Sequence, residues 1–217
     1  MTEPYNPLSK LNLARSIEGE ILGRDLIQLD QLGRFHGAGI YALYYAGDLD
    51  FYRPLKDSLA TDNPIPIYVG KAIPKGGRTG GLRTAEIRTI ALGSRLRKHA
   101  NSIGATPNLR LSDFLARYLV TDDVWIPLGE NMLIESYQPV WNKVIAGFGN
   151  NPLGRGRLNQ RVSLWDILHP GRIANVDVNR QSTTQAVLIE RVRKFLRGER
   201  VPEVDVHDLG DDEMDAD

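Results

Sequence analysis

The sequence GAGIYALYY, at residues 37–45, is the stretch on which the expected fold depends. Its composition is typical of a β-strand, because aromatic and β-branched residues fit a pleated, half-buried surface. Successive strand side chains point to opposite faces, so Tyr41 and Tyr45 share one face and Tyr44 lies on the other. We expect one of Tyr44 and Tyr45 to point inward and the other outward. Packing alone explains many such runs; the alternative is that Tyr41, with Tyr45 as second candidate, takes part in chemistry.

Two more strands are predicted downstream. Residues 65–72, IPIYVGKA, form the second strand, and residues 114–120, FLARYLV, form the third. The segment 46–64 is too long for a tight hairpin turn, so we expect an excursion with one helical turn of its own. Residues 74–81, PKGGRTGG, follow the second strand, and their glycines predict a flexible or closely approaching loop.

Helices are predicted on both sides of these strands. Apolar residues recur every four positions in residues 9–23 behind a possible Ser9 cap, which is typical of an amphipathic helix. A second helix is expected at residues 84–103. A third begins with Pro127 in its first turn and runs to about Tyr137, where Pro139 closes it.

The C-terminal part is expected to be less regular. Residues 147–180 are rich in Gly, Asn and Arg, and Trp165 is the expected anchor of this segment. Residues 184–196 form the last predicted helix, whose inward side chains are expected to be Val187, Leu188, Val192 and either Phe195 or Leu196.

Charge is unevenly distributed along the chain, although its 27 basic and 27 acidic residues balance. Residues 203–217 hold eight acidic residues and no Lys or Arg, so residues 1–202 carry a net charge of +8. Residues 71–110 alone contain nine Lys or Arg against one acidic residue. Such basic stretches are the electrostatic signature of a polyphosphate binder, although one such cluster can also be only a solvated face. The acidic tail is expected to stay disordered by self-repulsion.

Several classes of protein are excluded by composition. The absence of cysteine excludes disulfides, thiol catalysis and cysteine-based zinc sites. No two of the four histidines are close enough in sequence to suggest a local metal-binding pair. No apolar run is long enough to span a bilayer and the first residues lack a signal-peptide pattern, so we expect a cytoplasmic protein.

Three side chains have the chemistry of a catalytic site. Glu130 belongs to the apolar face of its predicted helix, where a carboxylate is costly unless a cation or donors meet it. A helix-dipole or capping role is the alternative for Glu130, while Glu135 is expected to be a solvated surface charge. Arg95 and His99, four residues apart, share one helical face and could hold a phosphate and move a proton.

Together these motifs resemble those of the GIY-YIG nuclease superfamily. GIY at residues 39–41 and YVG at 68–70 precede the pair Arg95 and His99. Glu130 begins the signature E-x2-L-I-x4-P-x2-N, which ends at Asn142. The order of these motifs is specific where the three-letter motifs alone are not. The resemblance covers about residues 37–142, with Val in place of Ile in the second motif and long insertions after Tyr45 and Lys71.

The resemblance implies an α+β fold, in which a small central antiparallel β-sheet is flanked by helices and carries a one-metal phosphodiesterase site. The residues that match the family's functional positions are Tyr41, Tyr68, Arg95, His99, Glu130 and Asn142. Glu130 would hold Mg²⁺ or another divalent cation such as Mn²⁺, and Arg95 would grip the scissile phosphate. Tyr41 would contact the attacking water as base or orienter with help from His99, and Tyr68 would fix the phosphate or water. Asn142 would fasten the loop after the helix to the site.

The resemblance extends to one group within the superfamily. Residues 141–172 and the insertions look like type II restriction endonucleases, specifically the SacII-like group that cuts CCGCGG. Because one single-metal site cuts one strand, we expect a homodimer on double-stranded DNA, with a cognate DNA methyltransferase as functional partner. Two alternatives stay open: a structure-selective or mobile-element nuclease, and a non-catalytic DNA-binding module.

This interpretation divides the chain and assigns its basic residues. The expected parts are an N-terminal helical arm (1–36), a catalytic core (37–146) with insertions at 46–63 and 72–90, a DNA-contacting extension (147–202) and the acidic tail (203–217). The side chains expected to contact DNA are Lys71, Arg78, Arg83, Arg97, Lys98, Arg155, Arg157 and Arg161.

Overall fold

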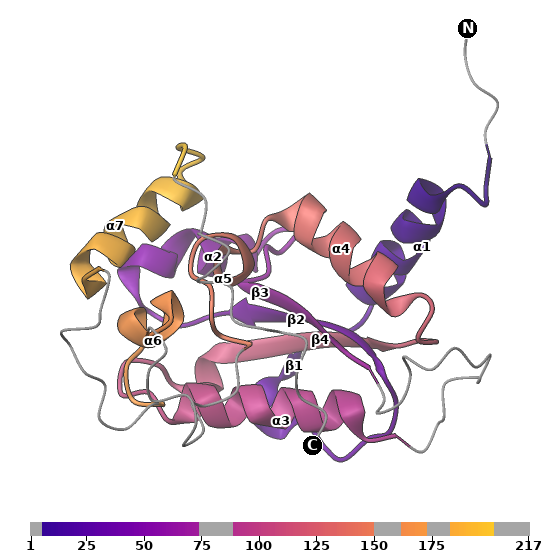
Figure 1. The fold of residues 1–217 in the computed structure, drawn as a ribbon, viewed down its shortest axis with the longest axis horizontal. Coiled ribbons are helices and arrows are strands. Elements are labelled where there is room, and N and C mark those ends of the chain that lie inside the picture. Colours follow the sequence, from indigo (N-terminus) through magenta and orange to yellow (C-terminus); the bar gives the residue numbers. More distant parts are fainter. Residues whose placement is uncertain (1–5, 74–88, 150–161, 173–182, 202–217) are drawn as a thin grey trace, which may run out of the picture.

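A computed structural model of the chain describes residues 6–73, 89–149, 162–172 and 183–201. Its centre is a four-stranded antiparallel sheet in the order β1-β4-β2-β3. The strands are β1 (Ile27–Gln28), β2 (Gly39–Tyr45), β3 (Tyr68–Ala72) and β4 (Phe114–Val120). Helices flank the sheet, with α1 and α4 on one side of it and α3 on the other (Figure 1). The expected α+β fold is confirmed.

Seven α-helices lie in the described part of the chain. They are α1 (Lys10–Leu22), α2 (Arg53–Ser58), α3 (Ala91–Gly104), α4 (Ile126–Tyr137), α5 (Val140–Lys143), α6 (Leu164–Leu168) and α7 (Gln185–Leu196). Ser9 caps α1 through its side chain, as predicted, and Thr184 does the same for α7. None of these helices is long and apolar enough to cross a membrane.

Strand β2 lies at the centre of the core, because all seven of its residues are buried. Tyr41 and Tyr45 belong to the larger apolar cluster, which also receives side chains from α3, α5, α6 and α7. Tyr44 belongs to a second cluster on the opposite face, with side chains from α1 and α4. The predicted division of the tyrosines between two faces is confirmed. The expected outward tyrosine is wrong, because helices cover both faces of this central strand.

Steric constraints explain why glycine occupies a position in each of the two three-letter motifs. A Cβ atom on Gly39 would collide with the carbonyl oxygen of Leu119, on the neighbouring strand β4. A Cβ atom on Gly70 would collide with the hydroxyl group of Tyr41. Gly39 therefore lets two central strands approach, and Gly70 leaves room for the Tyr41 ring to lie across β3.

Several predicted boundaries agree with the structure and others do not. Strand β4 has the predicted ends, and α4 begins one residue before Pro127 and ends at Tyr137. Strand β3 begins three residues later than predicted. The helix predicted from residue 84 begins at Ala91, because residues 89 and 90 are not helical; residues 84–88 lie outside the described part, as does the glycine-rich stretch 74–81.

The remaining segments combine confirmation and correction. The excursion 46–64 contains a 3-10 turn (Asp50–Tyr52) and α2, as expected of a segment with its own helical turn. Within the segment predicted to be irregular, Trp165 is fully buried in α6. In α7, Val187 is 58% exposed, so the prediction that it points inward is wrong. The division into arm, core and extension stays a prediction, and the acidic tail lies outside the described residues.

Candidate active site

Three of the side chains predicted for the site meet on one face of the sheet. Tyr41 comes from β2, Tyr68 from β3 and His99 from α3. The hydroxyl oxygen of Tyr41 lies 2.6 Å from Nε2 of His99. The ring centroids of Tyr68 and His99 are 5.3 Å apart, and those of the two tyrosines are 6.2 Å apart. A phenol and an imidazole are thus within reach of a proton transfer.

Strand register brings the two tyrosines together although 26 residues separate them in the sequence. Tyr41 pairs with Gly70, and Leu43 pairs with Tyr68, in the antiparallel β2–β3 ladder. Because residues two apart on a strand share a face, Tyr68 and Gly70 both lie on the face of Tyr41. Helix α3 packs over this face through Leu92, Leu96 and Ile103, and it places His99 against both phenols.

Phe148, which sequence reasoning missed, covers the third side of this cluster. Its ring stacks on His99 with centroids 4.4 Å apart and planes 18° apart. It also meets Tyr68 edge to face, at 4.9 Å between centroids. Phe148 lies in a segment without strand or helix periodicity, so its sequence carries no signal of this position. The aromatic contacts fix the plane of the His99 ring.

The environment of His99 determines its protonation state. Burial holds the pKa of His99 well below its usual value, and the positive charges of Arg95, Arg172 and Lys98 lower it further. The side chain is therefore neutral near pH 7. A neutral imidazole has one donor nitrogen and one acceptor nitrogen, so His99 can receive a proton from a neighbour.

Mild acid is expected to destabilise the fold through two buried histidines. Burial lowers the pKa of His169 to about 3 and that of His99 well below its usual value. Below about pH 6.5 the histidines of the unfolded chain bind protons, and those of the folded chain do not. The free energy of unfolding is therefore at its full value above that pH. It decreases as pH falls toward the pKa values of the folded protein, by about 1.4 kcal/mol per pH unit for each histidine. Urea unfolding between pH 8 and 5 measures this slope.

The exposed histidine His36 provides the matched control for this measurement. His36→Gln is expected to leave the slope of stability against pH unchanged, whereas His99→Gln is expected to reduce it. A free energy of unfolding that stays constant from pH 8 to pH 5 in the unmodified chain would contradict the assignment of two neutral buried histidines.

Arg95 lies one helical turn before His99, and both side chains face residues 148 and 149. Its Nη2 donates a hydrogen bond of 2.9 Å to the carbonyl oxygen of Gly149, next to Phe148. The structure thus brings Arg95 and His99 to one side of α3, as their spacing predicts. The neighbouring Arg97 and Lys98 are exposed.

Glu130 approaches the same strand β3 from α4. Its carboxylate oxygen Oε2 forms an ion pair with Nζ of Lys71, 2.8 Å away, and the Glu130 side chain is 13% exposed. Lys71 directly follows Gly70, over which the Tyr41 ring lies. Lys71 pairs with Ile40 in the β2–β3 ladder, so it points to the face of the sheet that carries α4. The carboxylate therefore meets β3 from the face opposite to the Tyr41 phenol.

The donor set fits a hard divalent cation that keeps most of its water. Within the described residues, no three His, Asp or Glu side chains form a cluster of metal ligands. Mg²⁺ is bound in many phosphate-handling sites by one or two carboxylates, with waters and substrate phosphate completing the octahedron. Glu130 already stabilises a cation, the Lys71 ammonium, at its carboxylate. A single partly exposed carboxylate that already pairs with a cation matches this requirement.

Asn142 holds the edge of the sheet beside the tyrosines. Its Oδ1 accepts from the main-chain N–H of Val69 at 2.8 Å, and its Nδ2 donates to the carbonyl oxygen of Val69 at 2.8 Å. Among the described residues β3 is the edge strand of the sheet, so these two main-chain groups have no neighbouring strand there on that side. The amide thus replaces a strand neighbour and fixes the main chain between Tyr68 and Gly70.

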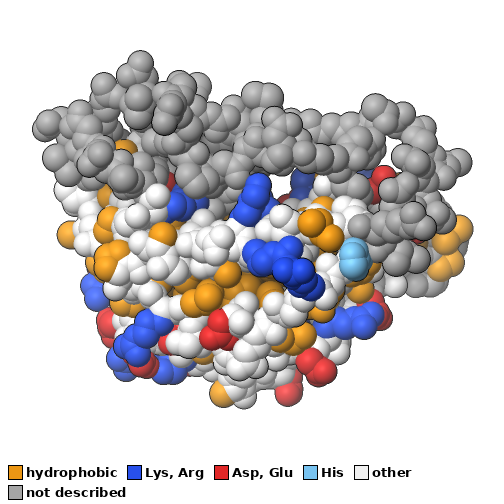
Figure 2. Space-filling model, turned by 90° about the horizontal axis from the view of Figure 1, so that it is seen from below, with side chains coloured by type: hydrophobic (Ala, Val, Ile, Leu, Met, Phe, Trp, Pro, Cys, Tyr) orange, Lys and Arg blue, Asp and Glu red, His pale blue; other side chains and the backbone are white. Residues whose placement is uncertain are grey.

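The residues expected to contact DNA are only partly described by the structure. Arg97 and Lys98 lie exposed on α3, and Lys71 is 41% exposed while paired with Glu130. Figure 2 shows the molecule from the side of α3, where Lys and Arg side chains gather near the centre of the view. The others lie outside the described residues: Arg78, Arg83, Arg155, Arg157 and Arg161.

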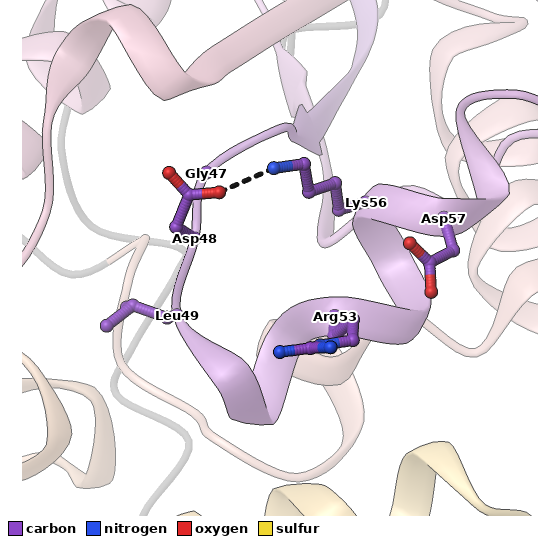
Figure 3. A pocket seen from close by; sticks show the side chains of 6 residues that line it. All are labelled: Gly47, Asp48, Leu49, Arg53, Lys56 and Asp57. Carbon is purple, nitrogen blue, oxygen red and sulfur yellow. Dashed lines mark hydrogen bonds and ion pairs between the residues drawn. The ribbon is translucent and has the colours of Figure 1, made fainter.

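A separate hollow lies in the excursion between β2 and β3 (Figure 3). Nζ of Lys56 pairs with the carboxylate of Asp48 across it, at 2.5 Å. Its lining consists of Gly47, Asp48, Leu49, Arg53, Lys56 and Asp57, and none of these is among the residues predicted for the site. The mixed charges and the polar rim give it no catalytic arrangement.

Comparison with known protein families agrees with this geometry. The family model described as the Eco29kI GIY-YIG domain, a restriction endonuclease family, matches residues 33–196. The match includes all six predicted catalytic positions and extends through α7. No curated protein matches the chain.

Proposed function

Because the chain belongs to the Eco29kI GIY-YIG family of restriction endonucleases, we propose that it is a type II enzyme that cuts double-stranded DNA at a short palindrome. The observation that carries this proposal is the 2.6 Å contact between the Tyr41 hydroxyl and His99. It joins a phenol from the first family motif to a buried neutral imidazole. This pair is suited to activating a water molecule for attack on phosphorus.

Tyr41 and His99 together supply the base. A phenol alone is a poor base, because the anion that would take a proton forms only near pH 10. In the proposed step, the Tyr41 oxygen takes a proton from the attacking water while its own proton passes to Nε2 of His99. The water oxygen then forms a bond to phosphorus, and the bond between phosphorus and the leaving sugar oxygen breaks. The leaving oxygen keeps the bonding electrons and takes up a proton from solvent water. Burial disfavours the charged imidazolium, so the transfer needs the negative phosphate nearby.

The other site residues act on the phosphate. The planar guanidinium of Arg95 is suited to binding phosphate oxygens bidentately. Tyr68, beside both Tyr41 and His99, positions the phosphate or the water. Glu130 would hold Mg²⁺, or Mn²⁺ in its place, and the bound ion would supply stabilisation of negative charge on the phosphoryl oxygens. Asn142 acts indirectly, by fixing the main chain of Val69 next to Tyr68.

Cleavage of both DNA strands at a palindrome requires two such sites. We expect a homodimer with two-fold symmetry, in which each chain cuts one strand. Lys71, Arg97 and Lys98 contribute phosphate contacts, and so do the basic residues outside the described part. Arginines that reach guanine edges in the major groove suit a G·C-rich site such as CCGCGG. A DNA methyltransferase that modifies the same site is the expected functional partner.

Cleavage of matched DNA duplexes tests the specificity. A duplex containing CCGCGG is expected to be cut in both strands in the presence of Mg²⁺. A duplex with one central base pair exchanged is expected to be cut about 5- to 150-fold more slowly, because one mismatch costs about 1–3 kcal/mol of binding. Equal cutting of both duplexes would favour a structure-selective nuclease. Binding without cutting would favour a DNA-binding module.

A further inference from the structure

A buried ion pair in the C-terminal part of the chain contacts the wall of the candidate active site. The carboxylate of Asp166, in α6, accepts from Nε and Nη2 of Arg172 at 2.9 and 2.8 Å. Both side chains are nearly inaccessible, at 3% for Arg172 and 4% for Asp166. The Arg172 guanidinium also lies over the Trp165 ring, 4.7 Å from its centroid. Ser163 donates from Oγ to Asp166 at 2.6 Å.

Two further donors of Arg172 reach the turn that covers the site. Nη2 donates to the carbonyl oxygen of Gly147 at 2.9 Å, and Nη1 donates to that of Phe148 at 3.0 Å. A guanidinium presents its donors in a rigid plane, so the carboxylate on one side fixes the two carbonyls on the other. The turn thus has one favoured position relative to α6.

This turn contacts three residues of the site directly. The Phe148 ring stacks on His99 and meets Tyr68 edge to face. The Gly149 carbonyl accepts from Arg95. A small shift of the turn would therefore rotate the His99 ring away from the Tyr41 hydroxyl and move the Arg95 guanidinium. Displacements of about 1 Å at a reacting group lower rates by about 10²-fold.

We propose that Arg172, held by Asp166, is a positioning residue of the nuclease site: it fixes the 147–149 turn so that Phe148 and Gly149 orient His99, Tyr68 and Arg95. The inference rests on the proposed nuclease function. In this proposal, Arg172 supports catalysis through the 147–149 turn and does not contact the DNA itself. Because Arg172 is almost completely buried, its effect is on the rate of cleavage and not on the affinity for DNA.

A double variant, Arg172→Met with Asp166→Leu, tests this role while preserving the fold. Replacing both members of a buried ion pair by apolar residues of similar volume is often neutral for stability, whereas removing one member leaves an unpaired charge. The variant is expected to unfold at a temperature close to that of the unmodified protein. Its kcat is expected to fall about 10- to 100-fold with Kd for DNA within about twofold, the range found when groups supporting a site are lost. Arg193→Met, which removes the exposed ion pair to Asp50, is the matched control and should leave kcat unchanged.

The NMR signals of the histidine ring protons give a readout that is independent of cleavage. Stacking on Phe148 shifts the His99 signal, which His99→Gln identifies among the four histidines. The double variant is expected to move this signal, and Arg193→Met is not. If the unmodified protein cuts no DNA, the proposed function fails, yet the His99 signal still decides whether Arg172 orients the ring.

Two results would overturn the proposal. One is a folded double variant with unchanged kcat and an unchanged His99 signal. The other is a variant whose Kd for DNA rises while kcat stays the same, since that result would make Arg172 a DNA-binding residue. If the double variant does not fold, Phe148→Leu tests the same contacts, and unchanged kcat in that variant would equally contradict the proposed role of the turn.

Discussion

A Glu130→Gln variant should cleave DNA at least about 10³-fold more slowly than the unmodified protein at the same Mg²⁺ concentration. The substitution keeps the shape of the side chain but removes the negative charge that would hold the cation. It also removes the ion pair to Lys71. Single-turnover cleavage with excess protein measures the loss, because product release then does not limit the observed rate.

Glu135 gives the matched control, since it lies on the exposed face of the same helix. Glu135→Gln changes the net charge by the same amount and is expected to leave the cleavage rate within about twofold of the original, as for most surface substitutions. DNA affinity measured without a divalent cation should be preserved in both variants. A Glu130→Gln protein with the original rate would exclude Glu130 as the metal-binding residue.

Tyr41→Phe is expected to lower the single-turnover rate by about 10²- to 10⁴-fold, the usual contribution of a general base. The ring remains and fills the same space over Gly70, so the fold should be retained. The lost hydroxyl is the group 2.6 Å from His99. Without it, neither the water nor the histidine has a partner for the proton.

Tyr44→Phe provides the control on the opposite face of the same strand. Tyr44 is buried on the face of the sheet that carries α1 and α4, and the Arg117 guanidinium lies over its ring. Removal of its hydroxyl, on the face opposite to His99, is therefore expected to leave cleavage close to the original. If Tyr41→Phe and Tyr44→Phe cleave equally fast, the phenol of Tyr41 has no part in the chemistry.

The regular elements with strong patterns could be predicted from sequence, and the weaker ones could not. The run at residues 114–120 has strand composition, and Pro127 marks the first turn of α4, so both elements agree closely with their predictions. Strand β1 has only two residues, too few for any pattern. Val187 is predicted to point inward together with Leu188 and Val192. On a helix, however, neighbours point about 100° apart, and the buried stripe follows Leu188 and Val192.

For the candidate site, the sequence indicates the motif residues but not the residues that pack against them. The motif order identifies Tyr41, Tyr68 and His99 as a group, and the structure brings these three together. Phe148 lies 49 residues beyond His99 in a segment without periodicity, so no local pattern places it on the imidazole. Asp166 and Arg172 lie in a segment without a regular pattern, so their sequence does not indicate the buried ion pair or its contact with the turn at 147–149.

Digestion of plasmid DNA by the unmodified protein tests the central claim most directly. With Mg²⁺, the protein is expected to give discrete fragments whose ends all fall at one palindromic sequence, and chelation of the metal should stop the reaction. Intact plasmid after incubation with Mg²⁺, under conditions in which the protein demonstrably binds DNA, would contradict the account.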